Sequence, residues 1–329
     1  MSSLTHRSLT AQDLEQIAGI ASKTAGSPRK AFFEKRLAQA TAFPESFITC
    51  AVELDNKLVG YGFARVQNGD FGSNKPMVVL DDFGVVSEAR GAGVGKTIIA
   101  GLELRAKKRG ITILKTQVRW SDQALIGLFS SAGFKLAASY IIERDTSVLT
   151  EYVAEVASIK MDSKWQVQSS PGGNDYDLLA RDRVYIRSFK REDLPAIIRI
   201  DSKLSGRERS EYYETKSREV LDESGIRVSL VAEEDGHVTG FIMARVDFGE
   251  FGKLDPEAII DAIGVHPAYA GTGVGRALLS QLLLNLSTLK IESVSTLVSW
   301  TNFDLQRFLN RYGFAPSQRL VLSKDLGTV

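Results

Sequence analysis

The chain has 329 residues, 43% of them apolar and 25% charged, which is typical of a globular protein of about two domains. Its net charge of +1 provides no overall field that would favour nucleic acid or an anionic membrane surface. No apolar run approaches the roughly 20 residues needed to span a bilayer, so a membrane protein is not expected.

The first residues, MSSLTHRSLTAQDL, contain no apolar secretory core. The single cysteine, Cys50, excludes an internal disulfide and suits a reducing compartment. We therefore expect a cytoplasmic protein in which Cys50 is a buried packing residue of a strand.

The apolar pattern predicts the elements of the first half in chain order. They are helices over 11–23 and 29–41, strands over 47–54 and 58–66 joined by Asp55-Asn56, a strand over 77–86, a helix over 94–108, a strand over 111–118, a helix over 122–131 and a strand over 135–144. The second half repeats this order from about Val184.

The two halves are copies of one another at a single constant offset, without gaps over most of their length. Glycines and aromatic residues keep this register: Gly84, Trp120 and Phe134 correspond to Gly264, Trp300 and Phe314. A period of a domain's length indicates duplication of a whole domain. We expect a first domain over 1–150, a linker over 151–182 that contains a Ser-Pro-Gly cluster, and a second domain over 183–329.

A glycine-rich stretch follows the strand at 77–86 and opens the next helix, and it occurs in both halves. Loop amides and a helix N-terminus that face one way form a cradle for an anion such as a pyrophosphate. The stretch is not a nucleotide P-loop, because Arg90 stands where that motif needs its first glycine. It is not the dinucleotide fingerprint either, because Gly91, Gly93 and Gly95 lack the extra residue before the third glycine.

Arg90-Gly91-Ala92-Gly93-Val94-Gly95 resembles the acetyl-CoA-binding motif of the GNAT superfamily of N-acetyltransferases. The second copy, Ala270 to Gly275, fits except at Ala270, where the family has Gln or Arg. Gly-Phe after a short helix, at Gly133-Phe134 and Gly313-Phe314, is also similar to the family. The resemblance covers both halves and implies an α/β (α+β type) fold of two tandem GNAT-like domains, each a mixed, mostly antiparallel twisted sheet flanked by helices.

By this resemblance, the loops and the strand ends before them hold acetyl-CoA, the acetyl donor. In the first half the residues concerned are Val85, Val86, Arg90, Gly91, Ala92, Gly93, Val94, Gly95 and Lys96. In the second half they are Val265, His266, Gly271, Thr272, Gly273, Val274, Gly275 and Arg276. Asn302 stands where the family has a cofactor-contacting Asn, whereas the first half has Asp122 there.

Asp81 and Asp261 are corresponding acids inside apolar strands, and we consider both as catalytic residues. A buried carboxylate must be paired, hydrated or shifted in pKa. The two interpretations are a base or amine anchor, and an ion pair with the equally repeated Arg65 or Arg245.

We assign three further residues to the acceptor pocket: Asp82, which has no acidic counterpart in the second half, Trp120 and Trp300. For the two tryptophans, core packing is the alternative role. The family's general acid is a Tyr four residues before the Gly of Gly-Phe, and this chain has Phe129 and Leu309 there. Tyr140 and Tyr312 are nearby substitutes without positional support.

The sequence thus predicts an acetyl-CoA-dependent N-acetyltransferase acting on an amine of a small molecule or protein, with no metal and no nucleic-acid partner. The alternatives are a non-catalytic acyl-CoA-binding regulator, and one active domain beside a degenerate scaffold domain. A homodimer is compatible with the sequence. Each half shows one strand-like segment after Gly-Phe where the family has two. Residues 146–160, the other half of the chain or another subunit would supply the missing strand.

Overall fold

The computed structural model describes residues 4–25, 28–70, 75–147, 184–223, 226–247, 251 and 255–327. Within them the chain divides into two compact units. The first comprises described parts of 1–141, 248–256 and 316–329, and the second those of 142–247 and 257–315. Each unit therefore contains segments from both halves of the sequence. The linker expected at 151–182 lies outside the described residues.

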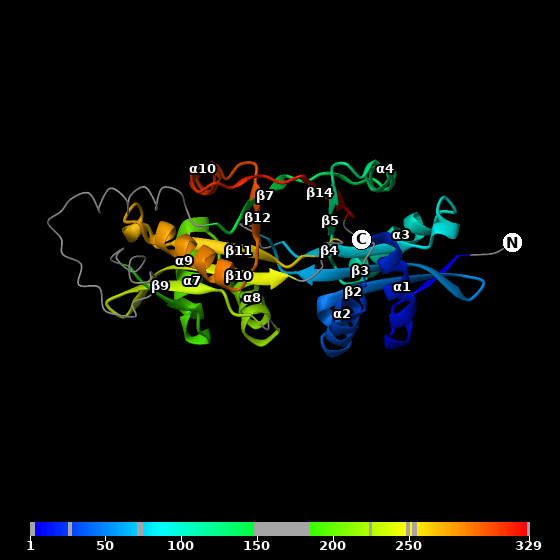
Figure 1. Ribbon diagram of the computed structural model, residues 1–329, viewed down its shortest axis with the longest axis horizontal. Coiled ribbons are helices and arrows are strands. Elements are labelled where there is room, and N and C mark those ends of the chain that lie inside the picture. Colours follow the sequence, from blue (N-terminus) through cyan, green and yellow to red (C-terminus); the bar gives the residue numbers. More distant parts are fainter. Residues whose placement is uncertain are drawn as a thin grey trace. The chain divides into compact units, whose positions relative to one another are not determined.

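The elements follow the same order in both halves (Figure 1). The first half contains β1 (Thr5–Arg7), α1 (Leu14–Ala25), α2 (Lys30–Ala42), β2 (Phe47–Leu54), β3 (Lys57–Gln67), β4 (Met77–Val85), α3 (Val94–Lys108), β5 (Ile113–Arg119), α4 (Gln123–Ser131), β6 (Lys135–Leu136) and β7 (Ser139–Asp145). The second contains β8 (Tyr185–Ser188), α7 (Leu194–Ser205), α8 (Ser210–Arg218), a π-helical turn (Glu219–Glu223), β9 (Leu230–Glu234), β10 (His237–Asp247), β11 (Glu257–Val265), α9 (Val274–Thr288), β12 (Ser293–Ser299), α10 (Phe303–Arg311), β13 (Ala315–Pro316) and β14 (Arg319–Asp325). Short 3-10 turns lie at Ala11–Asp13, Pro44–Ser46, Ser87–Ala89, Arg191–Asp193 and Pro267–Tyr269.

Each unit is built on a seven-stranded sheet flanked by helices. The first sheet has the order β1-β2-β3-β4-β5-β14-β6, in which β4 and β5 are parallel and the other neighbours antiparallel. The second has the order β13-β7-β12-β11-β10-β9-β8, in which β11 and β12 are parallel and the pairs from β11 to β8 are antiparallel. This confirms the predicted fold of two mixed, mostly antiparallel sheets.

The two halves exchange a strand. β14, from the second half, lies beside β5 (Figure 1). It stands between β5 and β6 of the first sheet, with Arg319 opposite Arg119 and Asp325 opposite Ile113. β7, from the first half, lies between β12 and β13 of the second sheet. Of the three sources considered for the missing strand, the other half of the chain is the one observed.

The exchange corrects the prediction of a single strand over 135–144, which is two strands, β6 and β7. Between them, the backbone N–H of Ala137 donates to the carbonyl of Val321 on β14, 2.9 Å away. From Ser139 onward the chain belongs to a strand of the second sheet. The alternation of side chains continues across the break, so periodicity alone does not reveal it.

The expected turn between β2 and β3 is confirmed. Asp55 and Asn56 have φ values of +49° and +60°. Two successive left-handed residues form the type I′ turn that matches the twist of a two-residue hairpin, and Asp and Asn tolerate this conformation better than other side chains.

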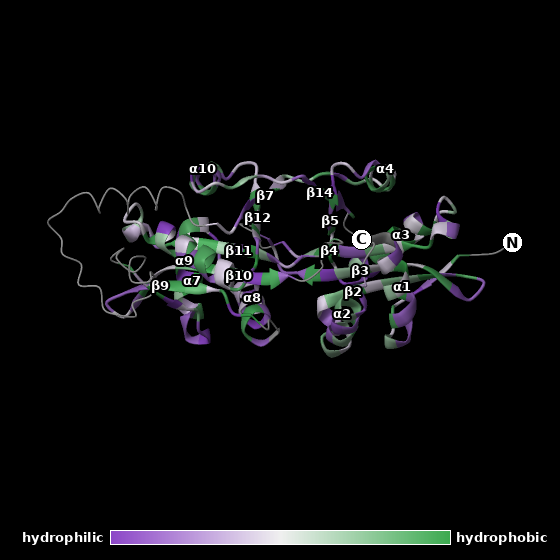
Figure 2. Ribbon diagram, viewed as in Figure 1, coloured by the Kyte–Doolittle hydropathy of each residue, from purple (hydrophilic) through white to green (hydrophobic). Residues whose placement is uncertain are grey.

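Helices cover both faces of the first sheet. α3 packs on β2 and β3 through apolar residues such as Ile98 and Leu102, while α1 and α2 pack on the opposite face around Phe33 and Phe63. The helices accordingly carry both hydrophobic and hydrophilic residues (Figure 2). Cys50 is fully buried beneath α3, as expected, and burial raises the pKa of its thiol.

Candidate functional site

The two parallel strands of each sheet separate at one point. The ladder between β4 and β5 ends at Leu80 and Thr116, although both strands continue. The hydroxyl of Thr116 donates to the carbonyl of Leu80 at 3.0 Å and closes the last pair. In the second sheet the ladder ends at Ile260 and Thr296, with the same bond at 2.8 Å. In the first unit, the residues of both strands just beyond Leu80 and Thr116 line a cavity.

The glycine-rich loop of the first unit follows β4 and leads into α3. Gly91 and Gly93 have φ values of +82° and +83°, which a residue with a Cβ adopts only with strain. A Cβ at either position would meet no atom within 4 Å, so the space above the loop is open. The first intrahelical bond is donated by Thr97 to Gly93, so the amides of Val94, Gly95 and Lys96 lie at the free end of the helix.

The second unit repeats this geometry. Gly271 and Gly273 have φ values of +80° and +94°, and α9 begins at Val274. A Cβ at either glycine again meets no atom within 4 Å. Both loops, with their neighbours Val85, Val86, Arg90, Ala92, Val265, Thr272 and Arg276, thus fit a bound anion.

His266 and Asn302 make local contacts in the second unit. The Nδ1 atom of His266 lies 3.2 Å from the backbone N–H of Ala268, and its Nε2 lies 2.8 Å from the Nζ of Lys203. The side chain of Asn302 accepts from the backbone N–H of Leu305 at 3.2 Å and caps α10. Asp122 caps α4 in the same way, so helix capping explains this position in both halves.

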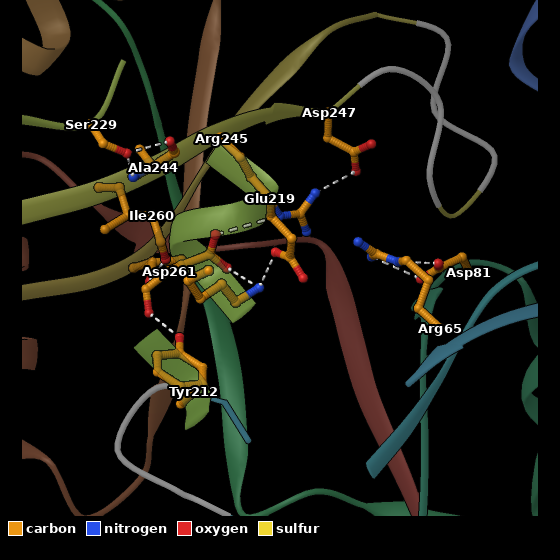
Figure 3. Close-up of polar contacts among 12 residues, drawn as sticks. Arg65, Asp81, Tyr212, Glu219, Ser229, Ala244, Arg245, Asp247, Ile260 and Asp261 are labelled. Atoms are coloured by element: carbon orange, nitrogen blue, oxygen red, sulfur yellow. Dashed lines mark hydrogen bonds and ion pairs between the residues drawn. The ribbon is translucent and has the colours of Figure 1, made fainter. Parts of the chain in front are cut away.

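Asp81 is the residue at which β4 bulges. Phe63 of β3 pairs with Asp82 and the next residue, Ala64, pairs with Leu80, so Asp81 is the extra residue. Its carboxylate accepts from the Nε and Nη2 atoms of Arg65, the latter at 3.0 Å (Figure 3). The geometry agrees with the ion-pair interpretation of Asp81.

Asp261 occupies the same bulge in β11, but its ion pair is looser. The Nε of Arg245 lies 3.5 Å from Asp261, and its Nη1 lies 3.9 Å from Asp247 (Figure 3). A lysine from α8 joins the group: the Nζ of Lys216 is 3.2 Å from Asp261 and 2.8 Å from Glu219. Burial acts to lower the pKa of Lys216, but Asp261 and Glu219 outweigh it and the pKa lies above its usual value.

Asp82, the next residue on β4, is buried in a network that sequence reasoning missed. The Nη1 of Arg29 and the hydroxyl of Tyr61 each donate to its carboxylate at 2.5 Å. Burial raises the pKa of Asp82 despite Arg29 and Tyr61, and it also raises the pKa of Tyr61 well above its usual value. One signal could have pointed to Arg29: in the register of the repeat it coincides with Arg209.

These residues line a cavity of about 370 Å³ in the first unit, where β4 and β5 separate. Asp81, Asp82 and Asp122 face it together with Arg29, Tyr61 and Phe129. Two more lining residues come from the second half of the sequence: Arg319 on the exchanged strand β14, and Phe251. The structure therefore brings Asp81 and Asp82 together in one cavity.

The two tryptophans do not belong to the core. Trp120 and Trp300 follow the ends of β5 and β12, and 60% and 55% of their surfaces are exposed. The core-packing alternative is therefore wrong. Trp120 is not among the residues that line the cavity of the first unit.

The positions of the family's tyrosine hold buried apolar residues. Phe129 packs against Phe83 and Phe134 with ring centroids 6.1 and 5.1 Å away, and Leu309 is fully buried. Of the substitutes considered, neither Tyr140 nor Tyr312 lines the cavity of the first unit, whose one tyrosine is Tyr61.

In the described part of the chain, no group of three or more His, Cys, Asp or Glu residues is arranged to hold a metal ion. Among the same residues, no helix is long and apolar enough to cross a membrane.

Comparison with known proteins agrees with this geometry. The acetyltransferase (GNAT) family matches residues 14–134 and 194–314, two regions whose first and last residues correspond in the repeat. Mycothiol acetyltransferase of Propionibacterium freudenreichii subsp. shermanii is 32% identical over 107 residues, which span 32% of this chain and 31% of that protein.

Two solved structures share the fold over almost the entire chain. A tandem GNAT protein from the clavulanic acid biosynthesis pathway has a TM-score of 0.63 at 15% identity, covering 99% of this chain and 100% of that one. A GCN5-related N-acetyltransferase from Sphaerobacter thermophilus has a TM-score of 0.59 at 17% identity, covering 98% and 96%. With the family matched over more than half of its length in two copies, the chain belongs to the acetyltransferase (GNAT) family.

Proposed function

We propose that this protein is an acetyl-CoA-dependent N-acetyltransferase that acts on an amine of a small molecule or protein. One observation carries the proposal: in each unit, an open glycine loop at a helix N-terminus lies beside two parallel strands that separate. An anionic donor with a long, narrow arm fits such a site. The related mycothiol acetyltransferase supports acetyl transfer, and its acceptor is not carried over to this chain.

The amides of Gly91 to Lys96, and of Gly271 to Arg276, would hold the donor's pyrophosphate. Positive φ at two glycines of each loop turns the amides outward, and the helix N-terminus adds a partial positive charge. Bound acetyl-CoA supplies an acetyl thioester. The backbone of β4 from Asp81 to Val85, and Val86 after it, would accompany the arm, since β5 no longer covers that edge.

The acceptor amine must lose a proton before it can attack, because a free alkylamine is protonated at neutral pH. Asp82 is the better placed base in the first unit: it lines the cavity, and burial raises the pKa of its carboxyl. Asp81 lines the same cavity, but both of its oxygens accept from the single guanidinium of Arg65. One oxygen of Asp82 accepts instead from the neutral hydroxyl of Tyr61, so we assign Asp82 the role of base and Asp81 that of a positioning residue. Asp261 takes the same role in the second unit, in contact with Arg245 and Lys216.

A regulator that binds acyl-CoA without catalysis is the second candidate. It is favoured by Phe129 and Leu309, which offer no proton to a departing thiolate in either half. An acetyltransferase would release CoA with at least one amine, whereas a regulator would bind acetyl-CoA without releasing CoA.

Two measurements on the full chain test the proposal: calorimetric titration with acetyl-CoA, and release of CoA with a panel of amines. Gly93→Trp and Gly273→Trp, made separately, fill one loop each. Gly110→Trp is a matched control, because Gly110 also has a positive φ and open space but lies at the opposite end of α3. Lys290→Trp serves the second unit, because Lys290 corresponds to Gly110 in the repeat and also has a positive φ.

We expect Gly93→Trp or Gly273→Trp to abolish binding at its own loop, while both controls bind as the unchanged protein does. Titration of the unchanged protein without any heat of binding would refute the proposal. Binding without release for any amine would favour the regulator.

A further inference from the structure

The cavity of the first unit contains two arginines on neighbouring strands. Arg119 ends β5 and Arg319 begins β14, and they stand directly opposite one another in the antiparallel ladder. Both line the cavity. Like charges directly opposite on two strands are by themselves unfavourable for a sheet.

The second half shows that the fold does not need this pair. In the register of the repeat, Arg119 corresponds to Ser299 on β12, and Arg319 corresponds to Ser139 on β7. The strands and their order are otherwise the same. The arginine pair is therefore a property of the first unit's cavity and not of the sheet.

The same cavity is lined by a carboxylate at a position where the second half of the chain has none. Asp82 lines it from β4, and the corresponding residue of the second half is Ala262. A ligand in this cavity thus meets Asp81 and Asp82 at the separation of the strands. On the β5–β14 side it meets two guanidinium groups and Asp122, whose carboxylate caps α4. Guanidinium groups recognise carboxylates and phosphates through paired, charge-assisted hydrogen bonds.

We propose that the acceptor of the first unit is a small amine that also carries an anionic group, a carboxylate or a phosphate. Arg119 and Arg319 bind the anionic group, and the amine faces Asp82. The inference rests on the proposed acetyl transfer and adds the class of acceptor. It also makes the second half of the sequence part of the first unit's site, because Arg319 comes from β14.

The test compares amines with and without an anionic group, on the full-length protein. Glycine, β-alanine, 4-aminobutanoate and 6-aminohexanoate are set against alkylamines of equal length, and 2-aminoethyl phosphate is set against ethanolamine. The amino acids test recognition of a carboxylate, and 2-aminoethyl phosphate tests recognition of a phosphate. We expect kcat/KM for the preferred acidic amine to exceed that of its neutral partner by at least about tenfold.

Arg119→Ser/Arg319→Ser installs the residues of the second half. We expect it to remove this preference by raising KM for the acidic amines. Arg199→Ser, an exposed arginine of α7 in the second unit, is the control and should keep the preference. If the double variant does not fold, Arg119→Gln alone, at an exposed position, should weaken the preference in the same direction.

Saturation-transfer NMR with the same amines, without acetyl-CoA, separates this inference from the proposed function. CoA release with neutral and acidic amines alike, unaffected by the double variant, overturns the inference and leaves acetyl transfer standing. Binding of acidic amines that depends on the two arginines, without any CoA release, supports their recognition by this cavity but overturns acetyl transfer, and with it their role as acceptors. The inference is also overturned if acidic amines do not bind and do not give preferential CoA release.

Discussion

Arg29 and Arg209 stand at corresponding positions, and each donates to a buried aspartate, but the two aspartates come from different elements. Arg29 binds Asp82 on β4, whereas Arg209 binds Asp201 on α7 at 2.8 and 2.5 Å. The tyrosine of each network differs in the same way, Tyr61 on β3 and Tyr213 on α8. At the corresponding positions of the other half, alanine replaces each aspartate and phenylalanine replaces each tyrosine.

The arginine, aspartate and tyrosine arrangement of the second half can be installed in the first unit by substitution. Asp82→Ala leaves Arg29 buried without its carboxylate, which should lower the free energy of unfolding by about 3 to 5 kcal/mol. Adding Ala21→Asp, Phe33→Tyr and Tyr61→Phe installs the second half's network and should restore most of that loss. Denaturant unfolding measures both effects. Activity should remain lost in the quadruple variant, because the carboxylate no longer lies on β4.

Full recovery of acetyl transfer in the stable quadruple variant would contradict the role of Asp82 as base. Asp82→Asn keeps the shape of the side chain and provides the conservative comparison. We expect Asp82→Asn to lower kcat strongly and to lower the free energy of unfolding less than Asp82→Ala does.

The pair of Arg7 and Asp13 gives stability a dependence on pH. The two nitrogens of Arg7 donate to Asp13 at 2.7 Å each, and the backbone of Thr10 donates to it at 2.7 Å. Burial acts to raise the pKa of Asp13, but these hydrogen bonds outweigh it and the pKa lies below its usual value. A lowered folded-state pKa adds stability that is present above the unfolded pKa of about 4 and disappears as the pH falls through the folded pKa.

We therefore expect Asp13→Asn to cost about 2 kcal/mol at neutral pH and almost nothing at the acid end of the transition. Urea unfolding between neutral and acidic pH measures this. Asp193→Asn should behave alike, because Arg187 binds Asp193 at 2.8 Å in the same arrangement. Glu34→Gln, at an exposed position of α2, should leave the profile unchanged, and a pH-independent loss in Asp13→Asn would contradict the linkage.

Two glycines of β3 hold α3 close to the sheet. A Cβ on Gly60 would lie 2.7 Å from Val94, and one on Gly62 would lie 2.6 Å from Ile98. Gly60→Ala should therefore push the first turn of α3 outward, cost about 1 to 3 kcal/mol and weaken donor binding at the adjacent loop. Thermal unfolding and calorimetry check this. Gly19→Ala, on α1 with open space around it, should instead stabilise the protein by up to about 1 kcal/mol.

Removing the exchanged strand tests what it contributes to the first sheet. A chain that ends at residue 316 lacks β14, including the buried Val321 and Leu322. We expect the first unit to lose on the order of 5 kcal/mol and the amides of β5 to exchange faster with deuterium. The amides of β12 should be unaffected, because β7 still pairs with that strand. Unchanged protection of β5 would show that β14 is dispensable.

Much of the architecture could be predicted from the sequence because its signals are local or periodic. The hairpin at Asp55-Asn56, the helix that begins at Val94 and the glycine loops all depend on residues close in the chain. Asp81 and Arg65 could be paired in advance because both recur, in the same register, as Asp261 and Arg245.

Contacts between distant residues could not be predicted in this way. Asp82 was expected near an acceptor, but its partners Arg29 and Tyr61 come from other elements and have no local pattern. The exposure of Trp120 and Trp300 contradicts the usual burial of aromatic residues, which composition alone would have suggested. The strand exchange is invisible because β7 and β14 are corresponding sequences, and either one satisfies the hydrophobic pattern of either sheet.

Strand exchange imposes an order on the synthesis of the first unit. β5 ends at Arg119 and its neighbour β14 begins only at Arg319, so most of the second half is made between two strands that lie side by side. At about 5 to 20 residues per second, the ribosome needs roughly 10 to 40 s to deliver the second strand after the first. Throughout that interval β7, which emerges earlier and has the matching sequence, is a competitor for the same edge. The nascent chain must keep that edge available, or release β7 from it, before the native pairing can form.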